Sequence, residues 1–533
     1  MKNFDTFGVM IDMSRNAVMT IDSLKRFLPL IKKMGYNCVM LYTEDTYEVN
    51  NEPYMGYMRG KYSKEELKEL DAFVHGLGMD LIPCVQTLAH LNATTLWGKL
   101  PIDYDDILLV DDARTYEFIE NIFSTLSECF SSKRIHIGMD EAHMVGRGRH
   151  CDLYGYETKF DVMIRHLNRI REMAKKYDFE LMIWSDMFFR CWNNGRPYIP
   201  RTKVPDEIVT QFPKDVIPVY WDYYHYDEDE YSAMIENHKQ FSDKTWFAAA
   251  VGGSNAFAPH NRVSINITKP GLDACVKQGV RNVMVTLWGD NGGECSHFSQ
   301  LPALYYLAQY AKGIIDENKI KKGFKSLIGI DFDDYLQVDL PNEVVPCSTE
   351  TCNPSRYMFY SDYFNGFLDY TVKIGEGKKH KNISNLLLKT AKKSRRYGYV
   401  FDTLAKLCDV LTIKYDLGAR TRVAYQSGDK DELLRLAKED YPAVIKTVKA
   451  FLKTFEKQWY IENKPSGFDV QHLRFGGLLL RTEACKKRIL DYLNEKVASI
   501  PELEEKILPF SKSEKEKSFR IGNVERLATP NVR

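Results

Sequence analysis

The sequence lacks most of the features that would place it in a specialised class of protein. Its 73 Lys and Arg residues are balanced by 73 Asp and Glu residues, so it has no excess positive charge to favour nucleic acid or an anionic membrane as its main partner. It contains no run of 18 apolar residues and its first residues show no apolar stretch of signal length. We therefore expect a cytoplasmic protein without a nucleic-acid or membrane partner that acts on small molecules.

Signs of a disulfide framework, a metal or a cofactor are also missing. The 11 cysteines show no CxxC spacing and are odd in number, which favours reduced thiols. His90, His136 and His143 lie near acids but have neither an i, i+4 pair nor an HExxH spacing. The glycine pairs at 252–253 and 292–293 are interpreted as tight turns, because no phosphate-binding glycine pattern surrounds them. We expect no metal and no cofactor.

What the sequence does contain is a repeated strand and helix pattern from residue 7 to about 290. Eight nearly continuous apolar runs turn polar at their C-terminal ends, as parallel strands covered on both faces do. The runs are 7–14, 38–45, 80–86, 134–140, 180–186, 217–224, 245–253 and 282–290. Helical patterns follow, one from Thr20 to a stop at Gly35 and another opened by the capping box of Ser63 and Glu66. Others are 114–130, 161–177 and 300–313.

Eight strand and helix units predict an α/β fold of the (β/α)8 TIM-barrel type, with an open doubly wound sheet as the alternative. Past residue 320 the pattern changes: 320–356 looks irregular, and long helical patterns then dominate. These are 383–415, 430–457 and 470–495. We predict a catalytic barrel over 1–320 and a C-terminal α-helical domain over 321–533, which offers a surface for a homodimer. The aromatic loop 459–468 is interpreted as a structural turn, with a substrate or subunit contact as the alternative.

The C-terminal ends of the eight strands are the places to look for a site, because barrel enzymes carry their active sites there. The residues at these ends are mainly carboxylates, one arginine and aromatic rings. They are Arg15, Glu44, Asp45, Gln86, His90, Asp140, Glu141, Trp184, Asp186, Tyr220, Asp222, Trp246, Trp288, Asp290 and Glu294. Aromatic faces stack on the C–H faces of a pyranose, while carboxylates and guanidinium groups bind its hydroxyls. Direct contact by Glu44, Asp45 or Glu294 is left open, because acids are common at such ends.

Asp140 and Glu141 form the centre of this set. Successive side chains of a regular strand point to opposite faces, so two neighbouring acids share a pocket only where the strand stops being regular. Two carboxyl groups in different environments are the usual equipment of a glycoside hydrolase. Adjacent acids are poorly placed for a mechanism in which a protein nucleophile faces the acid across the bond. The adjacency favours a substrate that carries its own nucleophile.

The run His136-Ile-Gly-Met-Asp-Glu141 resembles the Asp-Glu signature of glycoside hydrolase family 20, the β-N-acetylhexosaminidases. Other strand ends match that family in chain order over roughly the first 300 residues. The chain departs from the family at Met139, where a second glycine is usual, and at Asp290, which is one methylene shorter than the usual glutamate. It also resembles a compact bacterial branch that lacks a small α/β domain before the barrel.

The resemblance implies roles for the strand-end residues. Arg15 would hold hydroxyls of the terminal sugar, and His90 stands near a position where a histidine is common. In Tyr220-Trp-Asp222 the tyrosine would bind the acetamido carbonyl and the acid a distal hydroxyl. The remaining implied pocket residues are Trp184, Trp246, Trp288 and Asp290. The shorter Asp290 leaves the choice between N-acetylglucosamine and N-acetylgalactosamine open.

By the same resemblance Glu141 protonates the leaving oxygen while the 2-acetamido oxygen of the substrate attacks the anomeric carbon, and Asp140 orients the acetamido nitrogen. The expected function is a retaining exo-β-N-acetylhexosaminidase acting on a glycoside or oligosaccharide. One alternative is a retaining glycosidase whose nucleophile is a protein carboxylate, such as Asp222 or Asp290, about 5 Å from Glu141. The other alternative is a non-catalytic protein that binds amino sugars in the same pocket.

Overall fold

Eight parallel strands close into a barrel. A computed structural model describes residues 3–253, 255–345, 353–508, 524–529 and 531. The strands follow one another around the barrel in the order β1-β10-β9-β8-β7-β6-β3-β2, which confirms the (β/α)8 prediction over the open sheet. They are β1 Thr6–Asp12, β2 Cys38–Tyr42, β3 Asp80–Cys84, β6 Arg134–His136, β7 Glu180–Trp184, β8 Ile217–Trp221, β9 Trp246–Ala250 and β10 Asn282–Leu287. Each overlaps one of the predicted apolar runs.

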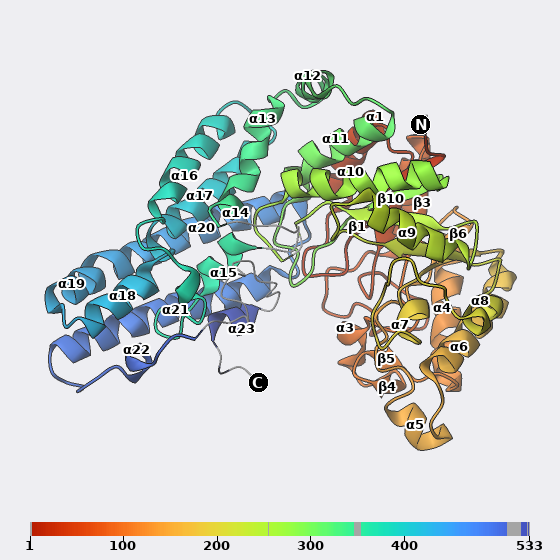
Figure 1. Cartoon of the computed structure of the whole chain (residues 1–533), viewed down its shortest axis with the longest axis horizontal. Coiled ribbons are helices and arrows are strands. Elements are labelled where there is room, and N and C mark those ends of the chain that lie inside the picture. Colours follow the sequence, from red (N-terminus) through yellow and green to blue (C-terminus); the bar gives the residue numbers. More distant parts are fainter. Residues whose placement is uncertain (1–2, 254, 346–352, 509–523, 530, 532–533) are drawn as a thin grey trace.

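The helices between the strands surround the barrel, on the right of Figure 1. They are α1 Ile21–Met34, α2 Lys64–Gly76, α4 Ala113–Cys129, α6 Lys159–Ala174, α7 Met187–Arg190, α8 Asp206–Gln211, α9 Glu228–Lys239, α10 Asn261–Gln278 and α11 Leu301–Ala311. The predicted start and stop signals of α1 are present, because the Thr20 side chain accepts a hydrogen bond from the Ser23 amide and Gly35 is left-handed. The capping box of Ser63 and Glu66 opens α2 as predicted.

Short elements that the sequence does not predict extend the loops after β3 and β6. They are α3 Asn92–Thr95, the two-stranded sheet of β4 Ile102–Tyr104 and β5 Ile107–Leu108, and α5 Arg149–Tyr154. Such short segments show no readable hydrophobic period. They lie toward the bottom of the barrel half of the molecule in Figure 1.

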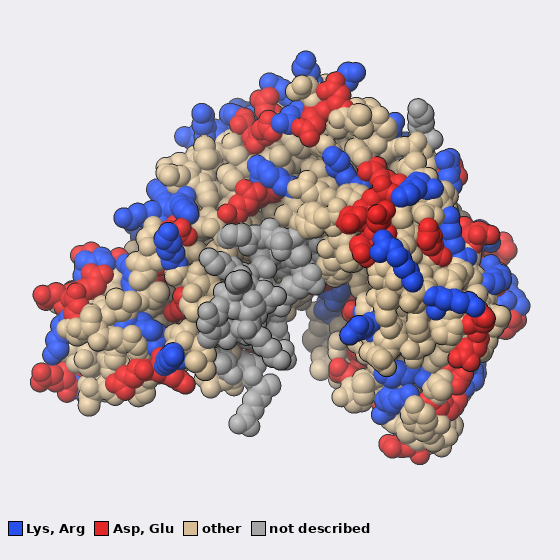
Figure 2. All heavy atoms as spheres, in the orientation of Figure 1, with Lys and Arg blue, Asp and Glu red and all other residues tan. Residues whose placement is uncertain are grey.

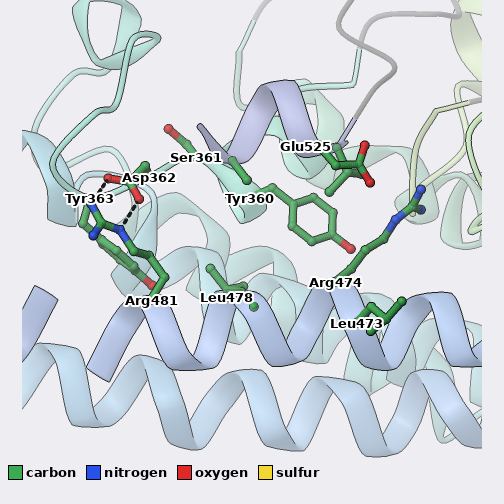
Figure 3. Close-up of a pocket in the computed structure, with 12 residues that line it drawn as sticks. Tyr360, Ser361, Asp362, Tyr363, Leu473, Arg474, Leu478, Arg481 and Glu525 are labelled. Carbon is green, nitrogen blue, oxygen red and sulfur yellow. Dashed lines mark hydrogen bonds and ion pairs between the residues drawn. The ribbon is translucent and has the colours of Figure 1, made fainter. Parts of the chain in front are cut away.

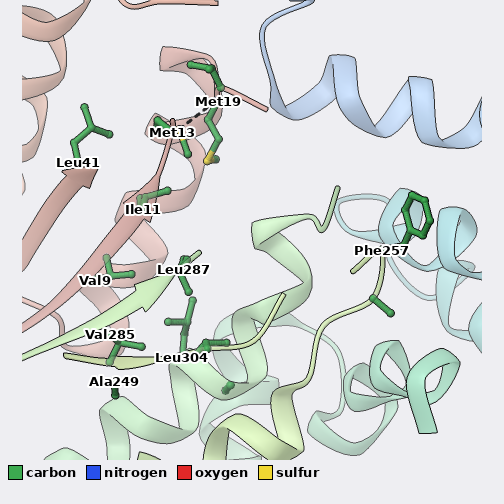
Figure 4. Close-up of a cluster of buried hydrophobic side chains, with 14 of the residues drawn as sticks. Val9, Ile11, Met13, Met19, Leu41, Ala249, Phe257, Val285, Leu287 and Leu304 are labelled. Atoms are coloured by element: carbon green, nitrogen blue, oxygen red, sulfur yellow. Dashed lines mark hydrogen bonds between the residues drawn. The ribbon is translucent and has the colours of Figure 1, made fainter. Parts of the chain in front are cut away.

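The strands bury both faces. Along β1, Val9 and Ile11 pack outward against the helices, whereas Met10 points into the barrel, as the two-residue period of a strand requires. Figure 4 shows the outward layer, with Val285 and Leu287 of β10 beside Leu304 of α11.

The barrel shares its outer core with the helical region. Phe257, in the loop between β9 and α10, lies 5.2 Å from the ring of Phe451 and 5.5 Å from that of Phe359. Both partners belong to C-terminal helices. The buried residues of the barrel and of the C-terminal region therefore form one continuous apolar cluster, so the helical region is packed firmly against the barrel.

The C-terminal region is helical, as predicted, and lies on the left of Figure 1. Its α-helices are α12 Glu317–Ile328, α13 Phe332–Tyr335, α14 Leu340–Glu343, α15 Pro354–Tyr360, α16 Lys378–Ala391, α17 Gly398–Lys414, α18 Leu417–Gln426, α19 Lys430–Arg435, α20 Tyr441–Glu462, α21 Phe468–Leu493, α22 Pro501–Glu504 and α23 Val524–Ala528. The division of the chain at residue 320 stays a prediction.

Two expectations for this region are wrong. The segment 320–356 is largely helical where the structure describes it, whereas Pro346, Cys347 and Cys352 lie outside the described residues. The predicted helix 383–415 is two helices. Between them the Ser394 side chain accepts a hydrogen bond from the Tyr397 amide at 3.2 Å, and Gly398 donates to the Ser394 carbonyl at 2.9 Å. These bonds close a turn that a purely apolar period does not reveal.

The surface carries charges of both signs. Figure 2 shows Lys and Arg intermixed with Asp and Glu over the face in view, in keeping with the zero net charge. Among the described residues, no helix combines the length and the apolar character needed to cross a bilayer. The nine cysteines in the described part of the chain are free thiols.

Candidate active site

A left-handed turn after β6 brings Asp140 and Glu141 into one cavity. The φ angles of Gly138, Met139 and Glu141 are +72°, +68° and +52°, so the chain is no longer a regular strand where the acids occur. A Cβ on Gly138 would lie only 2.1 Å from the Gln86 side-chain oxygen, so this position requires glycine. Both acids line a cavity of about 150 Å³ at the mouth of the barrel. The irregular strand end expected from the sequence is therefore present.

Gln86 fixes the turn to the neighbouring strands. Its Oε1 accepts a hydrogen bond from the Met139 amide at 3.2 Å, and its Nε2 donates to Asp140 Oδ1 at 2.8 Å and to the Tyr42 hydroxyl at 3.0 Å. Tyr42 in turn donates to Glu44 Oε1 at 3.0 Å. Tyr42 lines the cavity but is not among the site residues predicted from the sequence. Its place as the last residue of β2 is the signal that could have identified it.

His90 and Asp140 stabilise each other as an ion pair. His90 Nε2 lies 3.2 Å from Asp140 Oδ2 and 3.7 Å from Glu141 Oε2. Burial disfavours the charge on His90, but the carboxylates of Asp140, Glu44 and Glu141 prevail and raise its pKa to about 10. Burial likewise opposes the charge on Asp140, yet His90 and the bond from Gln86 lower the pKa of Asp140 below its ordinary value. Asp140 is therefore a carboxylate at neutral pH.

Glu141 is shifted in the other direction. Burial and the neighbouring charge of Asp140 raise its pKa, although His90 and Arg190 favour its ionised form. Arg190 Nη2 lies 3.5 Å from Glu141 Oε1, and its Nε donates to Asp186 Oδ2 at 2.9 Å. Asp186 Oδ2 also accepts a hydrogen bond from the Glu141 amide at 3.2 Å. Burial, and to a smaller extent the negative charge of Asp140, raise the pKa of Asp186 to about 7. Arg190 carried no sequence signal, because it follows β7 on a short helix.

Aromatic rings form the walls of the cavity. They belong to Trp184, Trp221, Tyr223, Tyr224 and Trp288. The rings of Trp184 and Trp288 are 6.0 Å apart, and those of Trp221 and Tyr223 are stacked at 5.6 Å. The indole N–H groups of Trp184 and Trp288 are buried without a hydrogen-bond partner among the described protein atoms. Buried donors are normally satisfied, so these two are suited to ligand oxygens.

Arg15 joins three acids at one side of the cavity. Its Nε, Nη1 and Nη2 lie 3.3 Å from Asp12 Oδ2, 3.3 Å from Glu44 Oε1 and 3.7 Å from Asp290 Oδ1. Arg15 and Asp290 line the cavity, as expected from the sequence. Glu44 lies behind Arg15, and burial raises the pKa of Glu44 to about 7.

Asp45 and Glu294, for which direct substrate contact was an open question, form ion pairs outside the cavity. Asp45 pairs with Arg59 at 3.0 Å. Glu294 pairs with Arg356 at 2.5 Å and with Arg474 at 2.7 Å. Neither acid lines the cavity.

Three expected pocket residues lie outside the cavity wall. Tyr220 faces outward from β8, where its ring lies 4.5 Å from His238 and its hydroxyl donates to Asp222 Oδ2 at 2.7 Å. Asp222 is buried and also accepts the Tyr224 amide at 3.1 Å, so it holds the loop after β8. Trp246 begins β9 and therefore packs inside the barrel at the opposite end, where the Arg134 guanidinium lies 5.4 Å from its ring. The structure therefore does not bring these three residues into the cavity wall, where the sequence places them.

A larger cavity in the helical region has a different character. It measures about 280 Å³ and is lined mainly by residues of α15, α21 and α23. Figure 3 shows Leu473 and Leu478 on one helix with Tyr360 above them. Its Asp362 is neutralised by Arg481, which donates two bonds at 2.6 and 2.9 Å. The paired acids at the barrel mouth remain the better candidate for catalysis. No cluster of three or more metal-ligating side chains occurs within the described residues.

Comparisons with known proteins agree with the geometry. Residues 4–239 match the catalytic domain of glycosyl hydrolase family 20, and residues 333–522 match the glycoside hydrolase 20C C-terminal domain. A β-hexosaminidase of Akkermansia muciniphila is 24% identical over 172 residues, which cover 25% of this chain and 34% of that protein. The chain thus spans about a third of the length of this curated relative.

Similar solved structures have low sequence identity. An exo-β-N-acetylglucosaminidase of Vibrio harveyi aligns with a TM-score of 0.46 and 15% identity over 61% of this chain and 58% of that chain. A mutant β-hexosaminidase of Streptomyces plicatus aligns with a TM-score of 0.43 and 17% identity over 62% of this chain and 69% of that chain.

Proposed function

The chain belongs to glycoside hydrolase family 20, and from this premise we propose that it is a retaining exo-β-N-acetylhexosaminidase. It releases terminal β-linked N-acetylglucosamine or N-acetylgalactosamine from glycosides or oligosaccharides by substrate-assisted catalysis. One observation carries this proposal: two adjacent carboxyl groups are turned into one aromatic cavity, and their pKa values are shifted in opposite directions. Environments that separate two carboxyl pKa values assign the acid and the anion.

Glu141 is the proton donor in this proposal. Its raised pKa keeps more of it protonated near neutral pH, as a general acid requires. It gives its proton to the glycosidic oxygen as the bond to the anomeric carbon breaks. It then takes a proton from the water that opens the oxazoline-type intermediate, so the configuration at the anomeric carbon is retained.

Asp140 stays ionised and orients the nucleophile. Its lowered pKa and its bonds to His90 and Gln86 hold a carboxylate at a fixed place. That carboxylate accepts the acetamido N–H and stabilises the positive charge that develops as the acetamido oxygen attacks. Asp140 need not attack the anomeric carbon, so its position next to Glu141 in the chain is no obstacle.

The acetamido carbonyl needs a donor other than Tyr220. We assign this role to the pair of Tyr223 and Tyr224, whose side chains line the cavity, and the unsatisfied indole N–H groups of Trp184 and Trp288 supply further donors. A protein nucleophile is less well supported. Asp222 is buried and bonded to Tyr220, and Asp290 lies beside Arg15.

The test compares three 4-nitrophenyl β-glycosides that carry N-acetylglucosamine, N-acetylgalactosamine or glucose. At least one acetamido sugar should be hydrolysed roughly 10³-fold faster than glucose, because an aligned intramolecular nucleophile has a very high effective concentration. Binding of N-acetylglucosamine without hydrolysis of any substrate would leave only the amino-sugar-binding alternative. Equal rates on the glucoside and the acetamido sugars would overturn substrate assistance.

A further inference from the structure

A second cavity lies beside Glu141, separate from the aromatic one. It measures about 280 Å³ and is lined by His143, Lys159, Met187, Arg190 and Gly195. Its walls come from the loops after β6 and β7 and from the start of α6, so it opens at the same end of the barrel as the catalytic pair. Arg190, in its wall, lies 3.5 Å from Glu141 Oε1. The cavity therefore adjoins the proton donor.

Because the cavity adjoins Glu141, it is suited to hold the part of the substrate that leaves when the glycosidic bond breaks. The general acid must lie within hydrogen-bond reach of the glycosidic oxygen, so the group attached to that oxygen passes close to Glu141. The side chain of Glu141 is 41% exposed, so its carboxyl group is open to solvent at the barrel mouth. A Cβ on Gly195 would meet nothing within 4 Å, so this wall has open space before it.

The walls carry positive charge that the protein does not fully neutralise. Arg190 is committed to Asp186, Glu141 and the Gly195 carbonyl. The ammonium group of Lys159 donates a hydrogen bond to the His143 carbonyl. Within the described part of the chain, no carboxylate lies within 4 Å of this ammonium group. Burial lowers the pKa of His143, and the charges of Arg190 and Lys159 lower it further, as expected where the local potential is positive.

We propose that this cavity is the subsite for a leaving sugar that carries an anionic group, a carboxylate or a sulfate, and that Lys159 provides the matching charge. The inference rests on the proposed function and names a substrate class for it: oligosaccharides in which the terminal acetamido sugar is linked to a uronic acid or a sulfated sugar. Met187, which is 1% exposed, contributes apolar atoms to the wall of the same cavity. The charged group confers preference between leaving sugars rather than catalysis itself.

The test uses two pairs of disaccharides with N-acetylglucosamine at the non-reducing end. The first pair has glucuronate or its methyl ester as the leaving sugar, and the second has glucose 6-sulfate or glucose. The anionic member of at least one pair should have a kcat/KM about 10-fold higher, the usual scale of a charge-assisted hydrogen bond. In Lys159→Gln this ratio should fall to about 1 to 2, and in Lys159→Arg it should largely return.

Lys175→Gln is the matched control, because Lys175 directly follows the other end of α6 and pairs with Glu172. It should keep the full ratio, and added salt should reduce the ratio of the unchanged protein. A ratio near 1 for both pairs in the unchanged protein would overturn the proposal, as would a ratio that survives in Lys159→Gln. If no disaccharide is cleaved and neither the aryl N-acetylglucosaminide nor the aryl N-acetylgalactosaminide is hydrolysed, it is the proposed function that fails; if only the galactosaminide is hydrolysed, the same pairs are made with N-acetylgalactosamine at the non-reducing end.

Discussion

Asp140 and Glu141 occupy neighbouring positions but differ in ionisation, because Asp140 has the closer cationic partner and an additional hydrogen-bond donor. His90 lies 3.2 Å from Asp140 and 3.7 Å from Glu141, and Gln86 donates a hydrogen bond to Asp140 but not to Glu141. The charge on Asp140 then raises the pKa of Glu141. The sequence supplied the two acids and their adjacency. Their separate roles depend on partners from other strands, which a single motif does not reveal.

Removing either carboxyl group should reduce turnover for different reasons. Asp140→Asn should lower kcat by about 10² to 10³ on every acetamido substrate, because it removes charge stabilisation. Glu141→Gln should lower kcat by about 10² to 10⁴ on an unactivated disaccharide. The decrease in kcat of Glu141→Gln should be much smaller on a 2,4-dinitrophenyl glycoside, because that leaving group needs little protonation. Near-normal turnover of the disaccharide by Glu141→Gln would contradict its role as the acid.

The pH profile should respond to the charge on Arg190. Activity must fall on the alkaline side as Glu141 loses its proton, and Arg190 favours the ionised form of Glu141. Arg190→Gln should therefore move the alkaline limb of kcat/KM to higher pH, whereas Lys175→Gln should leave it in place. A limb that stays fixed or moves to lower pH in Arg190→Gln would show that Glu141 does not set it.

At the scale of elements, the sequence predicts the strands and the helix caps but not the face of the strand from which each side chain projects. Apolar runs and capping residues are local signals, so all eight strands and the caps of α1 and α2 were found. The direction of a side chain depends on where the strand begins, and a shift of one residue reverses the face. Tyr220 consequently points outward, while Trp221 and Tyr223 line the cavity. Trp246 was misplaced because it begins its strand rather than ending it.

The turn after β6 can be tested with a matched pair of glycines. Gly138 and Gly279 have nearly the same φ, +72° and +73°, but a Cβ on Gly279 would meet nothing within 4 Å. Each Gly→Ala change should cost about 1 kcal/mol in unfolding free energy from backbone strain, and Gly138→Ala should cost more than Gly279→Ala because its Cβ would also collide with Gln86. Only Gly138→Ala should also reduce kcat, by roughly 10-fold or more, because Gln86 and Asp140 are displaced. Equal kcat values for the two folded variants would contradict the role of this turn.

At the scale of the whole molecule, the helical region supports the barrel mouth. Arg356 and Arg474 both bind Glu294, and both donate to Asn291, which follows Asp290 in the cavity wall. The continuous apolar cluster joins the same two parts of the chain. A C-terminal helical region was predictable from its long periodic patterns. Its contact with the site was not, because the partners are separated by more than 60 residues along the chain.

Substitutions of two arginines on α21 can distinguish support of the barrel mouth from a general contribution to the stability of the fold. Arg474 binds the loop beside Asp290, whereas Arg481, two turns further along the helix, pairs with Asp362 and lies over the Phe364 ring within the helical region. Arg474→Gln and Arg481→Gln should each lower the unfolding free energy by about 1 to 3 kcal/mol. Only Arg474→Gln should raise KM for the aryl N-acetylglucosaminide, by about 5- to 10-fold. An equal rise in both variants would indicate a general loss of folding instead.

Substrate assistance is the central claim, and the most direct measurement varies the nucleophile within the substrate. Three 4-nitrophenyl glucosaminides, N-acetyl, N-fluoroacetyl and N-difluoroacetyl, differ little in size while each fluorine makes the carbonyl oxygen less nucleophilic. If that oxygen attacks the anomeric carbon, kcat/KM should fall steeply with each fluorine, by about 10-fold or more per step, which corresponds to about 1.4 kcal/mol in the barrier. A kcat/KM that is unchanged across the series would contradict the account and favour a carboxylate nucleophile from the protein.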